Sequence, residues 1–144
     1  MILKRGITGF FDVDILVEND YKTFKQVCYC IQMNTTNFNL LDIYRPNNTN
    51  YFYAHFNTNG QDFYILLNKF HPIVAFTNEL TFMNKVFINV PEKPVYLMNY
   101  DIVNADILNS PFIDIENDLS KVELEQIKYY NPTSIGNIIF NEWD

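Results

Sequence analysis

Two aspartates near the N-terminus, Asp12 and Asp14, have the spacing most typical of an enzyme. Residues two apart on a β-strand point to the same face, so both carboxylates could share one divalent cation, as Asp-x-Asp pairs do in phosphoryl-transfer enzymes. Such enzymes need further residues: Leu16 stands where a threonine would be wanted, and no Gly-Ser or Gly-Gly helix start lies upstream. We interpret the pair as the solvated face of an amphipathic strand. A small metal-dependent phosphoryl-transfer or hydrolytic enzyme is kept as the alternative function.

The other groups able to do chemistry are two histidines and two cysteines. His55, His71, Cys28 and Cys30 make no metal-ligand spacing, and the chain contains none of the common nucleotide-binding, hydrolase or metal-binding motifs. Cys28 falls on the apolar face of a predicted helix and is expected to be an inert, buried thiol, whereas Cys30 falls off that face. Residues two apart on a helix diverge, so no disulfide joins them and a cytoplasmic protein is expected. A Cys–His catalytic pair stays open, since such partners need not be close in sequence.

Apolar patterning predicts the elements that would carry these residues. Alternation from about Phe10 to Val17 indicates a half-buried strand. Helical spacing then predicts a helix from Tyr21 to about Gln32, capped by Asn19 or Asp20. A hairpin with the turn Asn57-Thr-Asn-Gly60 follows. The further predicted strands are Leu40–Tyr44, Tyr51–Phe56, Phe63–Leu67, Ile73–Phe76, Val86–Val90 and Val95–Met98.

The last third of the chain has helical patterning. Ser120 with Glu123 forms a capping-box pattern, and the helix that it starts should end at Asn131 before Pro132. A final helix, capped by Thr133 or Ser134, would place Ile135, Ile138, Ile139, Phe140 and Trp143 on one arc and Asn137, Asn141 and Asp144 on the opposite one. The order of elements predicts an α+β fold in one domain, 1–144, with a mainly antiparallel sheet, an N-terminal helix and two C-terminal helices.

Charge is distributed unevenly along the 144 residues. Residues 101–144 contain nine acidic and two basic residues, which accounts for the whole formal net charge of −7. Binding to nucleic acids or to anionic membranes needs a basic footprint, and none is present, so neither is expected as a partner. The segment instead predicts a surface for a basic protein.

Five acids are the candidate partner-binding residues: Asp106, Asp114, Glu116, Asp118 and Glu125. Acids before a helix are also favoured by the helix dipole, which explains Asp118 and Glu116 locally but not the rest. Both interpretations, an interaction surface and solubilising charge, remain open. Trp143, the only tryptophan, could pack inward or anchor a partner.

The C-terminal run Pro132-Thr-Ser-Ile-Gly136-Asn-Ile-Ile-Phe-Asn141-Glu-Trp-Asp144, in a small, acidic, aromatic-rich chain, resembles immunity proteins of bacterial polymorphic-toxin and contact-dependent growth inhibition systems. The resemblance implies a cytoplasmic protein that binds and neutralises a cognate toxin domain, without catalysis of its own and without a cofactor. Many such toxins are basic nucleases, and an acidic face can mimic the phosphates that they bind. A structural subunit of a larger assembly is the third interpretation.

Overall fold

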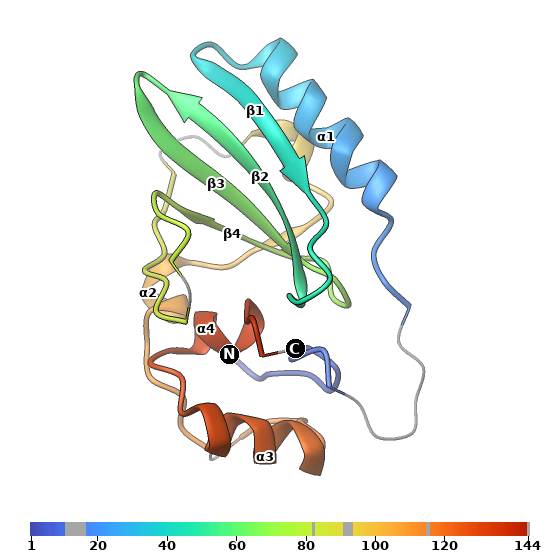
Figure 1. Ribbon diagram of the computed structural model, residues 1–144, viewed down its shortest axis with the longest axis vertical. Coiled ribbons are helices and arrows are strands. Elements are labelled where there is room, and N and C mark those ends of the chain that lie inside the picture. The colour runs from blue at the N-terminus through green and yellow to red at the C-terminus, as the bar shows by residue number, and fades with distance from the viewer. Residues whose placement is uncertain (11–16, 82, 91–93, 115, 144) are drawn as a thin grey trace.

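A computed structural model describes residues 1–10, 17–81, 83–90, 94–114 and 116–143. It confirms the α+β fold, with an N-terminal helix, a five-stranded sheet and C-terminal helices (Figure 1). The strand predicted from Phe10 to Val17, with Asp12 and Asp14, falls on 11–16, outside the described residues. Among the described residues, no helix has the length and apolar character needed to cross a bilayer.

The sheet has the strand order β1-β2-β3-β4-β5. Its strands are β1 Phe38–Tyr44, β2 Tyr51–Thr58, β3 Gln61–Asn68, β4 Ile73–Thr77 and β5 Asp101–Ile102. The first four run antiparallel, and β5 pairs with β4 in parallel. The predicted hairpin is confirmed: Asn59 and Gly60 both have positive φ angles between the paired residues Thr58 and Gln61, as a two-residue hairpin turn requires.

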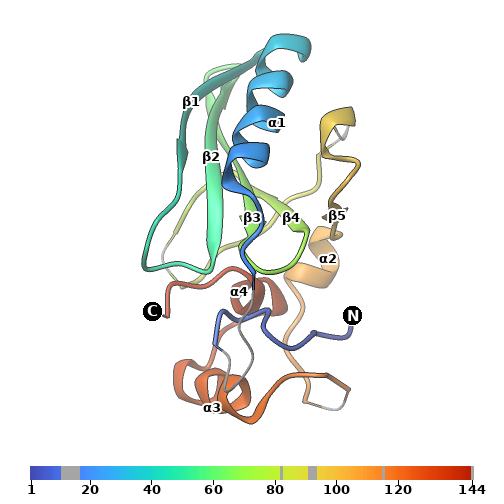
Figure 2. The same ribbon diagram turned by 90° about the vertical axis from the view of Figure 1, so that its right-hand side faces the viewer.

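Helix α1, Tyr21–Asn34, covers one face of this sheet (Figure 2). Asp20 caps its start by accepting a hydrogen bond from the Lys22 amide, as expected, and the helix runs two residues past the predicted end. Phe24, Cys28 and Ile31 point into a core shared with alternate residues of β2, β3 and β4. The prediction that Cys28 is buried is therefore confirmed.

Strand β1 contains a bulge that changes which side chains share a face. Leu40 pairs with Phe56 and Asp42 pairs with His55, so Leu41 is an extra residue between them. Without it, Leu40 and Asp42 would point to the same side of the sheet. The bulge instead keeps Leu40 against α1 and turns Asp42 and Tyr44 to the opposite face.

The lower half of that opposite face is covered by the C-terminal helices and the first residues of the chain (Figure 1). The helices are α2 Ala105–Leu108, α3 Lys121–Tyr130 and α4 Ile135–Ile139. The capping box of Ser120 and Glu123 is confirmed, as is the end of α3 at Asn131, which has a left-handed conformation. Leu3 and Ile7 join the core formed with α4.

The final helix was expected to continue to Trp143 but ends at Ile139. Phe140 leaves the helical conformation, and the chain then extends past β2 with the Asn141 amide donating to Asn50. Trp143 still packs inward, 6% exposed, with its ring stacked on Tyr130 at 5.0 Å. A Cβ atom at Gly136 would lie 2.2 Å from the Phe87 ring, so glycine permits this close packing of α4.

Two predicted strands are wrong. Val86–Val90 contributes only a single bridge, between Ile88 and Phe76. The Phe87 amide and carbonyl bond to the Asn109 side chain instead of to a neighbouring strand. Val95–Leu97 forms a short 3-10 turn, η1, that follows Pro94.

Candidate functional site

The five predicted partner-binding acids lie on α2, on α3 and on the segment that joins these helices. Asp106 is in the first turn of α2 and Glu125 is on α3. Asp114, Glu116 and Asp118 lie on the connection between the helices, which runs along the molecule toward α3 (Figure 2). All five are exposed to solvent. We refer to these five residues as the acidic segment.

Local hydrogen bonds give the acidic segment a defined backbone. The Asn117 side chain donates to Asp114 Oδ1 at 2.6 Å and accepts from the Leu119 amide at 3.0 Å. The Asp118 amide donates to the Leu3 carbonyl at 2.9 Å, which ties the segment to the N-terminal residues. These bonds tie Asp114 and Asp118 to neighbouring residues in front of α3.

Asp114 and Glu125 share a shallow groove of about 390 Å³ beside α3. Its floor is apolar, with Phe112, Leu124 and Ile127, and its walls also carry Lys121 and Lys128. The groove therefore combines apolar contact area with charges of both signs. Asp106, Glu116 and Asp118 do not line it.

Two acids counted with the charged C-terminal third are not on the surface. Glu123 is fully buried and accepts four hydrogen bonds. Its Oε1 accepts from the amides of Gly6 and Ser120, and its Oε2 accepts from the amide and hydroxyl of Thr8. The capping-box pattern predicted the Ser120 contact, but nothing in the sequence predicted that Glu123 would anchor the N-terminal residues.

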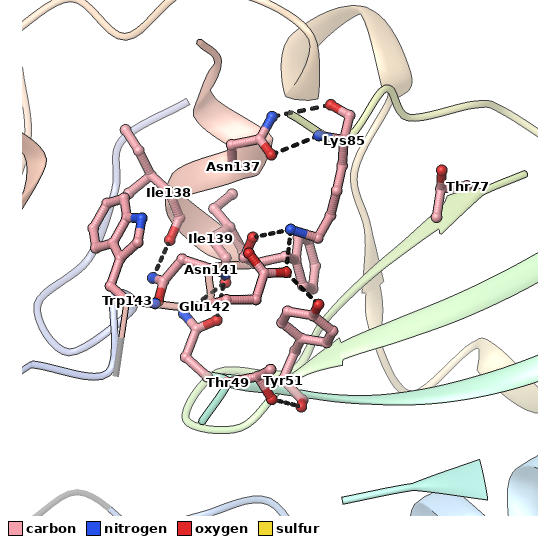
Figure 3. Close-up of polar contacts among 12 residues, drawn as sticks. Thr49, Tyr51, Thr77, Lys85, Asn137, Ile138, Ile139, Asn141, Glu142 and Trp143 are labelled. Carbon is pink, nitrogen blue, oxygen red and sulfur yellow. Dashed lines mark hydrogen bonds and ion pairs between the residues drawn. The ribbon is translucent and has the colours of Figure 1, made fainter. Parts of the chain in front are cut away.

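Glu142 is the second acid that is withdrawn from the surface. Its carboxylate pairs with the Lys85 ammonium and accepts from the Tyr51 hydroxyl, and both charged side chains are nearly or fully buried (Figure 3). Lys85 Nζ also donates to the Phe140 carbonyl at 3.2 Å and lies over the Tyr51 ring. Burial lowers the pKa of Lys85, while the nearby Glu142 opposes that shift. Burial, together with Glu142, raises the pKa of Tyr51.

Lysine, glutamate and tyrosine are all common acid–base groups, but this cluster holds the fold together. It joins the segment before Ile88 to the start of β2 and to the chain after α4. Asn137 reinforces the junction by bonding the Lys85 amide at 2.8 Å and the Lys85 carbonyl at 3.0 Å (Figure 3). Because the lysine is fully buried, the cluster presents no reactive group to solvent.

Asparagines form a second buried network, although Asn137 and Asn141 were expected on the polar arc of the last helix. Both are about 2% exposed. Asn141 donates to the Thr8 carbonyl, while Asn50 and Asn68 each donate to the carbonyls of Ile7 and Ile139. These side-chain amides donate hydrogen bonds to main-chain carbonyl groups where the N-terminal residues, the sheet and the chain after α4 meet without forming strands. Their role is structural, which the sequence did not reveal.

The structure separates one pair of the open Cys–His alternative, Cys28 and His55. His55 lies on the sheet face opposite α1, and Cys28 lies in the core under α1. Burial raises the pKa of the Cys28 thiol to about 12, so this cysteine is a poor nucleophile. Within the described residues, no three His, Cys, Asp or Glu side chains are grouped to hold a metal ion.

One surface was not predicted as a site. Asp42, Tyr44, Tyr53, His55, Asp62 and Tyr64 lie together on the face of the sheet that faces away from α1. The alternation of Tyr51, Tyr53 and His55 along β2 indicated part of this face, but the contribution of β1 depends on the bulge at Leu41. We call these six residues the tyrosine–carboxylate face.

Comparison with known proteins gives no relative for this chain. No protein-family model, no curated protein and no solved structure matches it. The candidate sites therefore depend on the geometry of this molecule.

Proposed function

We propose that this protein is an immunity protein that binds a cognate bacterial toxin domain in the cytoplasm and neutralises it without catalysis. The observation that carries the proposal is that all five carboxylates of the acidic segment are exposed within 20 positions of one another, from Asp106 to Glu125. The resemblance of the C-terminal run to immunity proteins supplies the class of partner. Because Trp143 packs into the core, that run belongs to the fold, which favours the acidic segment as the partner surface.

The acidic segment would attract a basic partner electrostatically, and the groove beside α3 would add shape complementarity. Carboxylates that face a basic partner raise the rate of encounter and disfavour acidic competitors. The groove beside α3 would then receive an apolar side chain, with Asp114, Glu125, Lys121 and Lys128 as its polar rim. For a basic nuclease, the carboxylates would occupy positions that phosphates occupy in the substrate.

The test measures binding to the toxin domain encoded directly upstream, with the Asp114→Lys, Glu116→Lys and Asp118→Lys triple variant. Association should be at least about tenfold slower than for the unmodified protein, and its dependence on salt should flatten, because electrostatic steering is lost. A matched control reverses three exposed acids elsewhere, Glu18, Glu79 and Asp101. The control should change the rate much less, because the acidic segment keeps its carboxylates.

Unchanged affinity and salt dependence in the triple variant would contradict a role for the acidic segment. Absence of binding by the unmodified protein to the upstream-encoded domain would contradict the immunity function itself. The two results are distinguishable, because the second is measured before any substitution is made.

A further inference from the structure

The tyrosine–carboxylate face is organised in rows across three strands. Tyr44 of β1 lies opposite Tyr53 of β2. In the next row, His55 lies between Asp42 of β1 and Tyr64 of β3. Asp62 of β3 completes the face one row further along. The bulge at Leu41 brings the β1 residues into these rows, and bulges commonly re-aim side chains near functional sites.

Contacts between the rings hold the face in one arrangement. Tyr44 stacks on Tyr53 with ring centres 4.6 Å apart, and His55 stacks on Tyr64 at 4.5 Å. Tyr53 and Tyr64 meet edge to face at 6.3 Å, which links the two stacks. Rings held in this way lose little side-chain freedom when a partner binds.

Two carboxylates flank these rings. Asp62 Oδ1 lies 2.8 Å from His55 Nε2, and its side chain is still 57% exposed. Asp42 is exposed on the other side of His55 and accepts from the Ile43 amide next to it. Burial is the main reason that the pKa values of Tyr53 and Tyr64 are raised, and Asp42 and Asp62 respectively add to it. Both phenols therefore stay neutral and can donate as well as accept hydrogen bonds.

Among the described residues, the rings of this face carry no lysine or arginine. Described lysines and arginines lie over the rings of Tyr21, Phe52 and Tyr51, and none lies over Tyr44, Tyr53 or Tyr64. Arg45, which follows Tyr44, turns toward Tyr21 and Glu18 instead. Among the described residues, therefore, no lysine or arginine partner is seen for Asp42, and the partner of Asp62 is His55.

We propose that the tyrosine–carboxylate face is a second protein-binding surface, and that its occupant is an arginine-bearing segment of a partner protein. A guanidinium group bonds a carboxylate through two parallel N–H groups and also packs on aromatic rings, which matches Asp42 and Asp62 beside Tyr44 and Tyr64. The residues that contribute most to binding energy at interfaces are enriched in tryptophan, tyrosine and arginine, and they tend to contact such residues on the partner.

This surface goes beyond the proposed function. Figures 1 and 2 place α3 at one end of the long axis and the turn between β2 and β3 at the other, so the face and the acidic segment belong to different parts of the molecule. The chemistry also disfavours a nucleic acid, although bases stack on aromatic rings, because its phosphates would meet Asp42 and Asp62.

The experiment is an NMR titration of the full, isotopically labelled chain with the peptide N-acetyl-Gly-Arg-Gly-Arg-Gly-amide. Shifts should concentrate on β1, β2 and β3 around the six residues, and the peptide with lysine in place of arginine should bind more weakly. The Asp42→Asn, Asp62→Asn double variant should weaken binding about tenfold or more, because charge-assisted bonds to arginine are lost. Asparagine keeps the acceptor atoms that bond Ile43 and His55.

The matched control is the Glu79→Gln, Asp101→Asn variant, which removes the same charge from two exposed acids outside both surfaces. Its affinity for the peptide should stay close to that of the unmodified protein. Shifts confined to α2 and α3, or equal loss in both variants, would overturn the proposal, because binding would then follow net charge. Shifts on the same face with methyl β-glucopyranoside but not with the arginine peptide would overturn it in favour of a sugar site. None of these results depends on the toxin-binding test.

Discussion

The buried ion pair of Lys85 and Glu142 shows how much the role of a single residue depends on distant partners. In the sequence, Glu142 is one of many acids near the C-terminus, and Lys85 is an isolated base. In the structure, the two meet beside Tyr51, and the lysine ammonium is fully enclosed. A charge in such a place is tolerated only when it is paired.

Replacing Glu142 with glutamine should lower the free energy of unfolding by about 3–5 kcal/mol, because the Lys85 charge is left buried without a counter-charge. The Lys85→Met, Glu142→Gln double variant should lose less than Glu142→Gln alone, since both charges are then removed. Urea unfolding followed by circular dichroism measures both values. The exposed Glu79→Gln is the control and should change little. A Glu142→Gln protein as stable as the unmodified one would contradict the buried pair.

The helices and strands differ in how well the sequence predicted them. The hairpin and α1 were predicted because Asn59-Gly60 and the periodicity of Phe24, Cys28 and Ile31 are local signals. The bulge at Leu41 was not predicted, because an extra residue is defined only by its pairing with β2. The helix α4 stops early because Asn141 bonds to Asn50, which is 91 positions away. Contacts at such separations leave no local pattern, and the buried role of Glu123 was missed for the same reason.

Helix α3 is joined to the N-terminal residues through Glu123, so this side chain should control the order of residues 1–10. Glutamine at this position keeps one acceptor oxygen, but its NH2 group replaces the other oxygen and cannot accept hydrogen bonds from the backbone amides. We expect Glu123→Gln to lower the free energy of unfolding by about 2–3 kcal/mol. Hydrogen exchange at the Gly6 and Thr8 amides should also accelerate well beyond the change in α1.

Glu125→Gln is the matched control for that substitution. It makes the same change two residues later on the same helix, at an exposed position. The exchange rates of Gly6 and Thr8 should stay as in the unmodified protein. If both variants speed exchange equally, the anchoring role of Glu123 is wrong.

The molecule as a whole is built as two apolar clusters on opposite faces of one sheet. One cluster lies under α1 and contains Cys28. The other unites the N-terminal Leu3 and Ile7 with Phe140 and Trp143 near the C-terminus. The second cluster covers only part of its face, which leaves the tyrosine–carboxylate face accessible beside it. Patterning in the sequence predicted the first cluster, whereas the second requires the two ends of the chain to meet.

Each cluster contains a group whose ionisation should make the whole molecule less stable at alkaline pH. Burial raises the pKa of Cys28 from 9.0 to about 12 and also raises that of Tyr51. For both acids, the unfolded chain loses its proton first as pH rises, so Cys28 favours the unfolded state above about pH 9 and Tyr51 above about pH 10. Lys85, whose pKa is lowered by burial, acts in the opposite direction below pH 10.5.

We therefore expect Cys28 to lower the free energy of unfolding between pH 9 and pH 10.5 by up to about 1.4 kcal/mol per pH unit. Cys28→Ala should be less stable at pH 7, because a core side chain is shortened, but its stability should fall less steeply as pH rises. Urea unfolding at matched ionic strength from pH 7 to pH 10.5 measures both the free energy of unfolding at pH 7 and its slope with pH. Cys30→Ala, a change at a partly exposed position two residues away, should keep the slope of the unmodified protein. Equal slopes in all three proteins would mean that Cys28 ionises as readily when folded as when unfolded, contrary to its place in the core.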